Sequence, residues 1–236
     1  MCGRFSLSKP SAAAERFGFV DWHEIRIEPR FNIAPTQEIL TIVQRRQGPP
    51  VAQIATWGFK PYWMLSGRRK RPPPINARAE TLTDSPMFRE ALAGRRCLIV
   101  ADGFYEWQRE VGNTTPAPVY IRLTSHELFA FAGLWAPGKP GSPPSAAIVT
   151  TQPNELMAPI HNRMPVILRP EHELLWLNPC VRTPEHVLPL LVPFPSAPME
   201  AYHVAPLVNS FQNDGPELIL PSPPERGAVV QAALPL

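Results

Sequence analysis

The chain lacks several features that would place it in a specialised class of protein. It has no run of about 18 apolar residues and no apolar stretch behind a basic start, so we expect neither a membrane span nor a signal peptide. It has only three cysteines, Cys2, Cys97 and Cys180, without a Cys-x-x-Cys pair or a nearby histidine pair. This pattern argues against a disulfide framework and a zinc site. We therefore expect reduced thiols, a cytoplasmic location, no membrane association and no metal or other cofactor.

Net charge is also low, because 23 basic residues stand against 20 acidic ones and leave a formal charge of +3. That surplus is too small to indicate nucleic-acid binding by itself. Four consecutive basic residues at 68–71 are followed by three prolines at 72–74. This run fits either a solvated loop or a loop that contacts phosphate groups, and the sequence leaves both open.

Proline is abundant, with 32 residues in 236, well above the average usage of about 5%. So much proline favours turns, short strands and ordered loops over long helices. With 44% apolar and 18% charged residues, the composition is that of an ordinary globular protein. We expect a monomer with a single α+β domain over residues 2–220, followed by a poorly ordered proline-rich tail at 221–236.

Short β-like segments recur along the chain with turn signals between them. The predicted strands cover residues 39–43, 51–57, 98–101, 119–123, 129–135, 146–150 and 166–168. Helices are predicted over 85–94, with Ser85 as N-cap, and over 153–157 and 170–177. The pattern indicates one mostly antiparallel, strongly curved or barrel-like β-sheet system with a few short helices.

The most informative residue is Cys2, directly behind Met1. If Met1 is removed, Cys2 carries a free amine and a thiol on adjacent carbons. The amine, with a reference pKa of roughly 7.7 to 8.0, can condense with an aldehyde to an imine, and the thiol can then close a five-membered thiazolidine ring. A cysteine at position 2 can also be incidental, so its context has to decide.

Several further motifs follow in order. They are Met-Cys-Gly-Arg-Phe at 1–5, Phe-Asn-Ile-Ala-Pro-Thr-Gln at 31–37, Trp-Gly at 57–58, Asn-Ala-Arg-Ala-Glu-Thr at 76–81, Arg-Arg-Cys-Leu at 95–98, Ala-Asp-Gly-Phe-Tyr-Glu-Trp at 101–107, Phe-Ala-Gly-Leu-Trp at 131–135 and Ile-His-Asn-Arg-Met-Pro at 160–165. In this order and spacing the chain resembles the SRAP (SOS-response-associated peptidase) family of abasic-site processing proteins, over roughly residues 2 to 220. The resemblance implies a single α+β domain whose N-terminus enters a central cleft.

The resemblance points to Cys2, Asn76, Glu106 and His161 as catalytic residues. A carboxylate bracketed by aromatic residues, as Glu106 is, gains a raised pKa when desolvated and suits acid/base work during imine formation. His161 could protonate the departing ring oxygen of the sugar, and the amide of Asn76 could hold the Cys2 amine or a sugar hydroxyl. Without the motifs, these would be an ordinary surface glutamate, a structural histidine and a turn asparagine. The other five histidines are interpreted as structural.

We also expect a DNA-binding surface made by Arg4, Arg78 and Arg163, to which the resemblance adds Trp107. Each arginine lies two residues after a catalytic candidate, so three guanidiniums would surround the reacting sugar and fork onto flanking phosphates. Trp57 and Phe59 are expected in the core, whereas a loop at 62–71 would wedge beside the lesion. The family usually has aspartate where this chain has Asn162, from which we expect modest slowing.

Three functions remain open at this point. The preferred one is covalent trapping of abasic sites in single-stranded DNA through a thiazolidine at Cys2, with strand cleavage by β-elimination as a side activity. The second is a thiol peptidase with Cys2 as N-terminal nucleophile, which would release Met1 from its own chain. The third is a single-strand binding module in which Cys2 has no chemical role.

Overall fold

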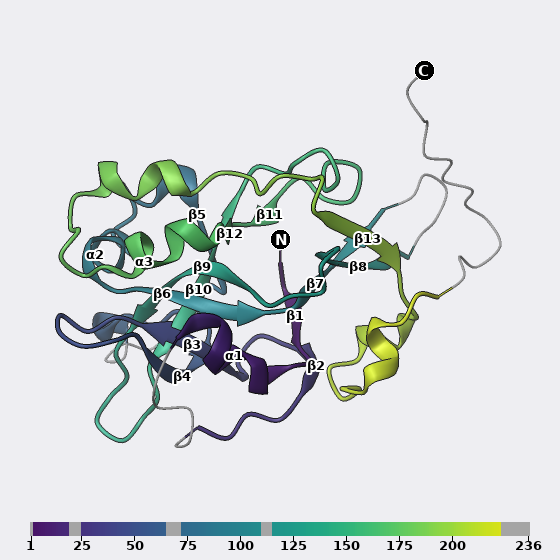
Figure 1. The fold of residues 1–236 in the computed structure, drawn as a ribbon, viewed down its shortest axis with the longest axis horizontal. Coiled ribbons are helices and arrows are strands. Elements are labelled where there is room, and N and C mark those ends of the chain that lie inside the picture. Colours follow the sequence, from purple (N-terminus) through teal and green to yellow (C-terminus); the bar gives the residue numbers. More distant parts are fainter. Residues whose placement is uncertain (1, 19–24, 65–71, 110–114, 223–236) are drawn as a thin grey trace.

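Two β-sheets form most of the structure, and the first strand of the chain belongs to the smaller sheet and lies near the centre of the molecule (Figure 1). The computed structural model describes residues 2–18, 25–64, 72–109 and 115–222. One sheet has eight strands and the other five. None of the helices within these ranges is long and apolar enough to cross a membrane.

Five strands of the larger sheet close into a barrel. They are β3 (Glu38–Val43), β4 (Val51–Trp57), β6 (Arg96–Ala101), β9 (Phe129–Ala136) and β10 (Ser145–Thr151). The ring closes because β10 pairs with both β4 and β9, while β3 joins β4 to β6 and β6 pairs with β9. Closure removes the free edges of these strands, so the curved barrel-like core expected from the sequence is confirmed.

The smaller sheet is antiparallel throughout and has the order β13-β8-β7-β1-β2. Its strands are β1 (Arg4–Leu7), β2 (Arg30–Ile33), β7 (Gly103–Gln108), β8 (Ala117–Leu123) and β13 (Met199–His203). Only Asp102 separates β6 from β7, so the chain passes from barrel to sheet at this residue. The Asp102 carboxylate accepts hydrogen bonds of 2.6 Å from the hydroxyls of Ser6 and Ser8, which fixes β1 against this crossing.

Short strands extend the larger sheet near the start of β1. They are β5 (Asn76–Arg78), β11 (Met164–Pro165) and β12 (Ile167–Leu168). Both β4 and β5 run parallel to β10, whereas the other strand pairs of this sheet are antiparallel. The Phe5 ring joins the two sheets, since its centroid lies 5.1 Å from that of Trp57 and 5.9 Å from that of Phe131. Trp57 and Phe59 are buried, as expected.

Helices are short, and one predicted helix is absent. The α-helices are α1 (Ala13–Phe17), α2 (Arg89–Gly94) and α3 (Pro170–Leu177), and the 3₁₀ helices are η1 (Pro10–Ala12), η3 (Tyr62–Met64), η4 (Ala79–Thr81), η5 (Pro184–His186), η6 (Leu188–Leu190), η7 (Pro206–Asn209) and η8 (Pro216–Ile219). The helix predicted over 170–177 is confirmed. The prediction over 85–94 was wrong at its start, because residues 86–88 form a turn in which the Ser85 carbonyl accepts the Phe88 and Arg89 N–H groups.

The helix predicted over 153–157 was wrong. Residues 155–160 form successive turns instead. The Asn154 side chain accepts the Met157 N–H at 2.9 Å, and Pro159 has no N–H to continue a helical ladder. His161 follows directly after these turns.

All seven predicted strand segments overlap observed strands, but β1, β2, β5, β7, β11 and β13 were not predicted. Of the predicted tail, Pro221 forms a bridge with Val204, and the Ser222 N–H donates to the His203 carbonyl at 2.9 Å. Residues 223–236 lie outside the described residues.

Candidate active site

Cys2 lies at the start of β1, beside β7 and β5. In the antiparallel pairing of β1 with β7, Arg4 lies opposite Tyr105. The residues that precede Arg4 therefore lie beside those that follow Tyr105, which places Cys2 near Glu106 and Trp107. On the other side, the Asn76 amide nitrogen donates to the Cys2 carbonyl at 2.9 Å. The Cys2 side chain is fully buried, and this burial raises the pKa of its thiol far above the ordinary value.

Glu106 is a buried carboxylate on β7, only 3% exposed. Desolvation penalises its charged form, and burial raises the pKa of Glu106 to about 7. Its charge in turn adds to the raised pKa of the Cys2 thiol, an effect second to that of burial. A carboxyl group that gains and loses its proton near neutrality therefore lies close to the Cys2 sulfur, as acid/base catalysis requires.

His161 is the fourth candidate and follows the turns that replace the predicted helix. Its Nδ1 accepts a 3.0 Å hydrogen bond from the Arg163 backbone N–H, so the neutral ring carries its proton on Nε2. Partial burial lowers the pKa of His161, which favours this neutral form. The side chain of Gln108, at the end of β7, donates to the Pro159 carbonyl at 3.1 Å and ties the turns to the strand that carries Glu106.

Arg163 is held by contacts within the protein. Its guanidinium makes two hydrogen bonds to Glu80, at 2.8 and 3.0 Å, and two to Thr150, at 2.7 Å to the carbonyl and 3.1 Å to the hydroxyl. Its side chain is 14% exposed. The bonds from Arg163 lower the pKa of the Glu80 carboxyl. Glu80 thus fixes Arg163, whose backbone in turn orients His161.

Arg4 is likewise engaged by the protein. Its Nη1 donates to the Asn32 side chain at 2.7 Å and to the Val208 carbonyl at 2.8 Å, and its guanidinium lies 5.8 Å from the ring centroid of Trp107. The Trp107 indole nitrogen donates to Asn209 at 2.7 Å. These contacts connect β1, β2 and β7 to the segment that begins with η7.

Arg78 differs from the other two arginines because it is exposed. It ends β5, in register with Thr150 on β10, two residues from Asn76. The structure therefore brings Cys2, Asn76 and Glu106 together, with His161 on an adjoining loop and Arg4, Arg78, Trp107 and Arg163 around them. Tyr62 and Trp63, at the start of the predicted wedge loop, are exposed, and residues 65–71 of that loop lie outside the described residues.

Sequence reasoning missed two positioning residues, Asn32 and Glu80. Both lie inside quoted motifs, at 31–37 and 76–81, which was the available signal. The Asn162 side chain is exposed. Glu80 forms an ion pair with Arg163, and a hydrogen bond from the Arg163 backbone N–H orients His161. A charge at position 162 is not needed for either contact.

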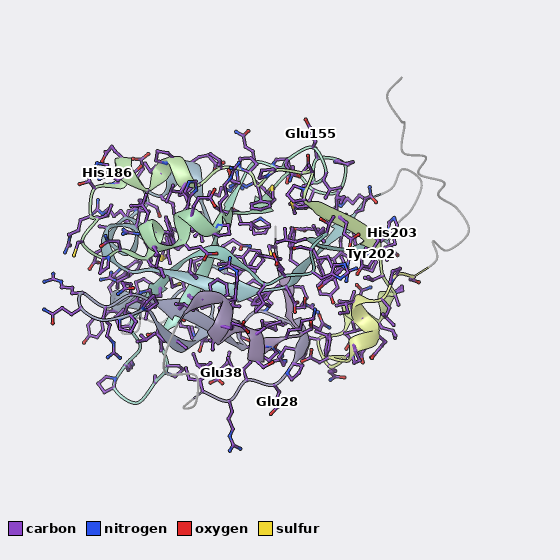
Figure 2. The ribbon with its side chains drawn as sticks, in the orientation of Figure 1. Glu28, Glu38, Glu155, His186, Tyr202 and His203 are labelled. Atoms are coloured by element: carbon purple, nitrogen blue, oxygen red, sulfur yellow. The ribbon has the colours of Figure 1, made fainter. Side chains whose placement is uncertain are left out.

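Three of the remaining histidines belong to other elements: His172 to α3, His186 to η5 and His203 to β13. Figure 2 shows His186 and His203 on opposite sides of the molecule. His126 lies 3.4 Å from the Glu200 carboxylate, and His23 is outside the described residues. Within the described part of the chain, no group of three or more His, Cys, Asp or Glu side chains could hold a metal ion.

The raised pKa of Glu106 predicts a pH dependence of stability. A pKa of about 7 in the folded state, against roughly 4.3 in the unfolded chain, gives a contribution that is complete below about pH 4 and lost as pH rises through 7. We expect the free energy of unfolding of the wild type, relative to Glu106→Gln, to fall by about 3 kcal/mol between pH 4 and pH 8. Urea unfolding of both proteins across this range measures the difference, and a constant difference would contradict the assignment.

The chain is similar to known proteins over most of its length. The family model described as SOS response associated peptidase (SRAP) matches residues 1–211. The chain is 44% identical over 224 residues to the abasic site processing protein YoqW of Bacillus subtilis, covering 93% of this chain and 99% of that protein. It is 28% identical over 228 residues to the abasic site processing protein YedK of Escherichia coli, covering 94% and 100% of the two chains.

A solved structure has the same fold. The crystal structure of a protein from Bacteroides thetaiotaomicron superimposes with a TM-score of 0.79 at 26% identity, covering 94% of this chain and all of that one. The α+β fold with its closed barrel is therefore that of a known structural group. The profile match over most of the chain, together with the relatives at more than 40% identity, shows that this chain belongs to the SOS response associated peptidase (SRAP) family.

Proposed function

We propose that the chain, once Met1 has been removed, captures the aldehyde of abasic sites in single-stranded DNA through the amine and thiol of Cys2. The observation that carries the proposal is the contact of Cys2 with Asn76 on one side and its electrostatic interaction with Glu106 on the other. Its relatives in Bacillus subtilis and Escherichia coli are named abasic site processing proteins, which supports the same substrate.

Asn76 offers a place for the new amine. Its Oδ1 is buried and has no hydrogen-bond partner among the described residues, while its Nδ2 already binds the Cys2 carbonyl. Removal of Met1 would turn the Cys2 amide nitrogen into an amine with additional N–H groups. An amine that donates to Oδ1 would satisfy this buried acceptor and hold the nitrogen for attack.

Trapping would proceed in three steps: opening of the sugar, formation of an imine and closure of the thiazolidine. To open the closed sugar, the C1 hydroxyl would give its proton to a water as the bond from C1 to the ring oxygen breaks. The ring oxygen would take the Nε2 proton of protonated His161, whose Nδ1–H can donate to the Arg163 carbonyl. The imidazole then regains a proton from that water, and the aldehyde is exposed. The neutral amine of Cys2 adds to the aldehyde carbon, and one amine proton moves to the new alkoxide oxygen. Glu106 then protonates this hydroxyl, which leaves as water, and takes back the remaining N–H proton, giving the imine. The Cys2 sulfur then bonds to the imine carbon, and the thiol proton passes to the nitrogen. The thiazolidine contains one water less than its reactants.

The four proposed DNA-binding residues would contribute in different ways. Arg78 is exposed and can fork directly onto a phosphate. Arg4 and Arg163 already donate to protein acceptors, so in this proposal they supply positive charge and fix the walls of the site. Trp107, partly exposed and held by Asn209, would stack on an unpaired base.

The second candidate function is a peptidase activity limited to the chain's own Met1–Cys2 bond. A carboxyl group with a pKa of about 7 beside Cys2 could serve as the base for hydrolysis of the Met1–Cys2 bond. Attack on peptide bonds of other proteins would need the thiolate as the first nucleophile, and burial, which raises the pKa of the Cys2 thiol, disfavours the thiolate. In trapping, by contrast, the amine makes the first bond. The imine intermediate would also permit slow strand cleavage by β-elimination.

One incubation separates these functions. The processed protein is mixed with a labelled single-stranded oligonucleotide that contains one abasic site, and products are resolved after heating. A heat-stable shifted band is expected with abasic DNA and not with intact DNA of the same sequence. Absence of the band with fully processed protein would reject trapping, and turnover of added peptides by the same sample would favour the peptidase.

A further inference from the structure

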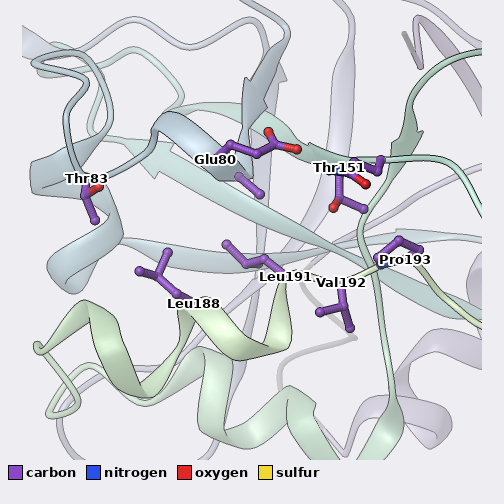
Figure 3. A pocket seen from close by; sticks show the side chains of 9 residues that line it. Glu80, Thr83, Thr151, Leu188, Leu191, Val192 and Pro193 are labelled. Carbon is purple, nitrogen blue, oxygen red and sulfur yellow. The ribbon is translucent and has the colours of Figure 1, made fainter.

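A cavity of about 450 Å³ opens beside η4 and the end of β10, outside the catalytic group. Figure 3 shows its lining: the Glu80, Thr83 and Thr151 side chains on one side and Leu188, Leu191, Val192 and Pro193 on the other. We propose that this cavity binds the base of an unpaired nucleotide next to the abasic one. The proposal rests on the proposed function and deepens it by naming a second contact with the substrate.

The division of the lining matches the shape of a nucleobase. A base has flat apolar faces, which pack well on the aliphatic wall made by Leu188, Leu191 and Val192. It also has a polar edge, which needs donors and acceptors such as Thr151 and Glu80 on the opposite wall. The volume is within the range of small-molecule sites.

The cavity lies along the path that a DNA strand would follow from Cys2. Asn76 touches Cys2, and the same segment continues through Arg78 to Glu80, which lines the cavity. Four residues span at most about 14 Å of chain, so a neighbouring nucleotide lies within reach. Arg78, exposed between the two places, is positioned for the phosphate that joins the two nucleotides.

The carboxylate in this wall does not repel DNA as a free charge would. Glu80 is paired with Arg163 through two hydrogen bonds, and Arg163 lowers the pKa of Glu80. The Glu80 side chain is nevertheless 42% exposed, and a carboxylate has more acceptor positions than Arg163 occupies. It can therefore accept a hydrogen bond from an exocyclic amine, which adenine, cytosine and guanine carry and thymine lacks.

The test uses single-stranded oligonucleotides with a central tetrahydrofuran, an abasic analogue without an aldehyde, so that binding is measured without covalent trapping. A second tetrahydrofuran replaces one flanking base on either side in turn. By fluorescence anisotropy, loss of the base on one side is expected to weaken binding about tenfold, and on the other side by less than about twofold. Thymine at the sensitive position should bind several-fold more weakly than the other three bases.

Val192→Asp places a charge on the apolar wall at a position 52% exposed, where the fold should tolerate it. This variant is expected to lose the dependence on the flanking base, while Leu174→Asp on α3, 68% exposed in the native chain, keeps it. Equal binding of all oligonucleotides by the wild type, no binding at all, or unchanged base dependence in Val192→Asp would overturn the proposal. Heat-stable trapping of authentic abasic DNA is scored separately, so a failure of the cavity site leaves the test of trapping intact.

Discussion

Cys2→Ala is expected to reduce the yield of heat-stable product with abasic DNA by at least about 100-fold. The variant keeps the terminal amine, because alanine at position 2 also permits removal of Met1, but it lacks the sulfur that closes the thiazolidine. An imine alone hydrolyses back to amine and aldehyde, so it does not survive heating. The measurement is the shifted band after incubation of each protein with the abasic oligonucleotide.

Two controls make this result specific. Borohydride reduction should still trap the imine of Cys2→Ala, which shows that the amine works without the thiol. Cys180→Ala removes the one exposed thiol among the three cysteines and should leave the band unchanged. An undiminished band from Cys2→Ala, without reduction, would contradict the assignment of the thiol.

Glu106→Gln is expected to slow trapping by about 10²-fold or more. General acid–base catalysis is typically worth about 10²–10⁴-fold, and Glu106 is the group next to Cys2 whose pKa, about 7, matches that task. Glutamine preserves the size and the hydrogen-bonding capacity of the side chain but cannot transfer a proton. The first-order rate at saturating DNA should fall, while the affinity for an abasic analogue should change little.

The pH dependence of the trapping rate tests the role of Glu106 independently. In the wild type the rate should rise as the amine loses its proton, and then decline as Glu106 loses the proton that it donates to the departing water. Glu106→Gln should keep the rise and lose the decline. Glu155→Gln is a matched control, since Glu155 is exposed and lies apart from the centre (Figure 2). A decline that persists in Glu106→Gln would assign it to another group.

The strands that the sequence predicted are those with long apolar or alternating runs. β6 and β9 are almost wholly buried, so their apolar runs were recognisable. β1 and β2 have four residues each and a register shift between Phe5 and Leu7. Such short segments are strands only because they pair with distant partners, and local pattern contains no information on that pairing.

The site also has a part that the sequence predicted, the reacting residues, and a part that it did not, the contacts that position them. Cys2 was recognisable from its place behind Met1, and Asn76, Glu106 and His161 from motifs. The contacts that position them depend on the fold: Arg4 with Asn32 and Arg163 with Glu80 join residues 28 and 83 positions apart. Three arginines were expected to face DNA as equals, yet only Arg78 is exposed, because burial and pairing of the other two follow from packing.

Intact-mass measurement of the chain, before and after reaction with abasic DNA, tests the central claim most directly. The account predicts that the reactive chain lacks one methionine residue, that the adduct has the summed mass of protein and DNA less one water, and that digestion places the link on the N-terminal peptide that begins with Cys2. A stable adduct on chains that retain Met1, or a link on any other residue, would contradict it.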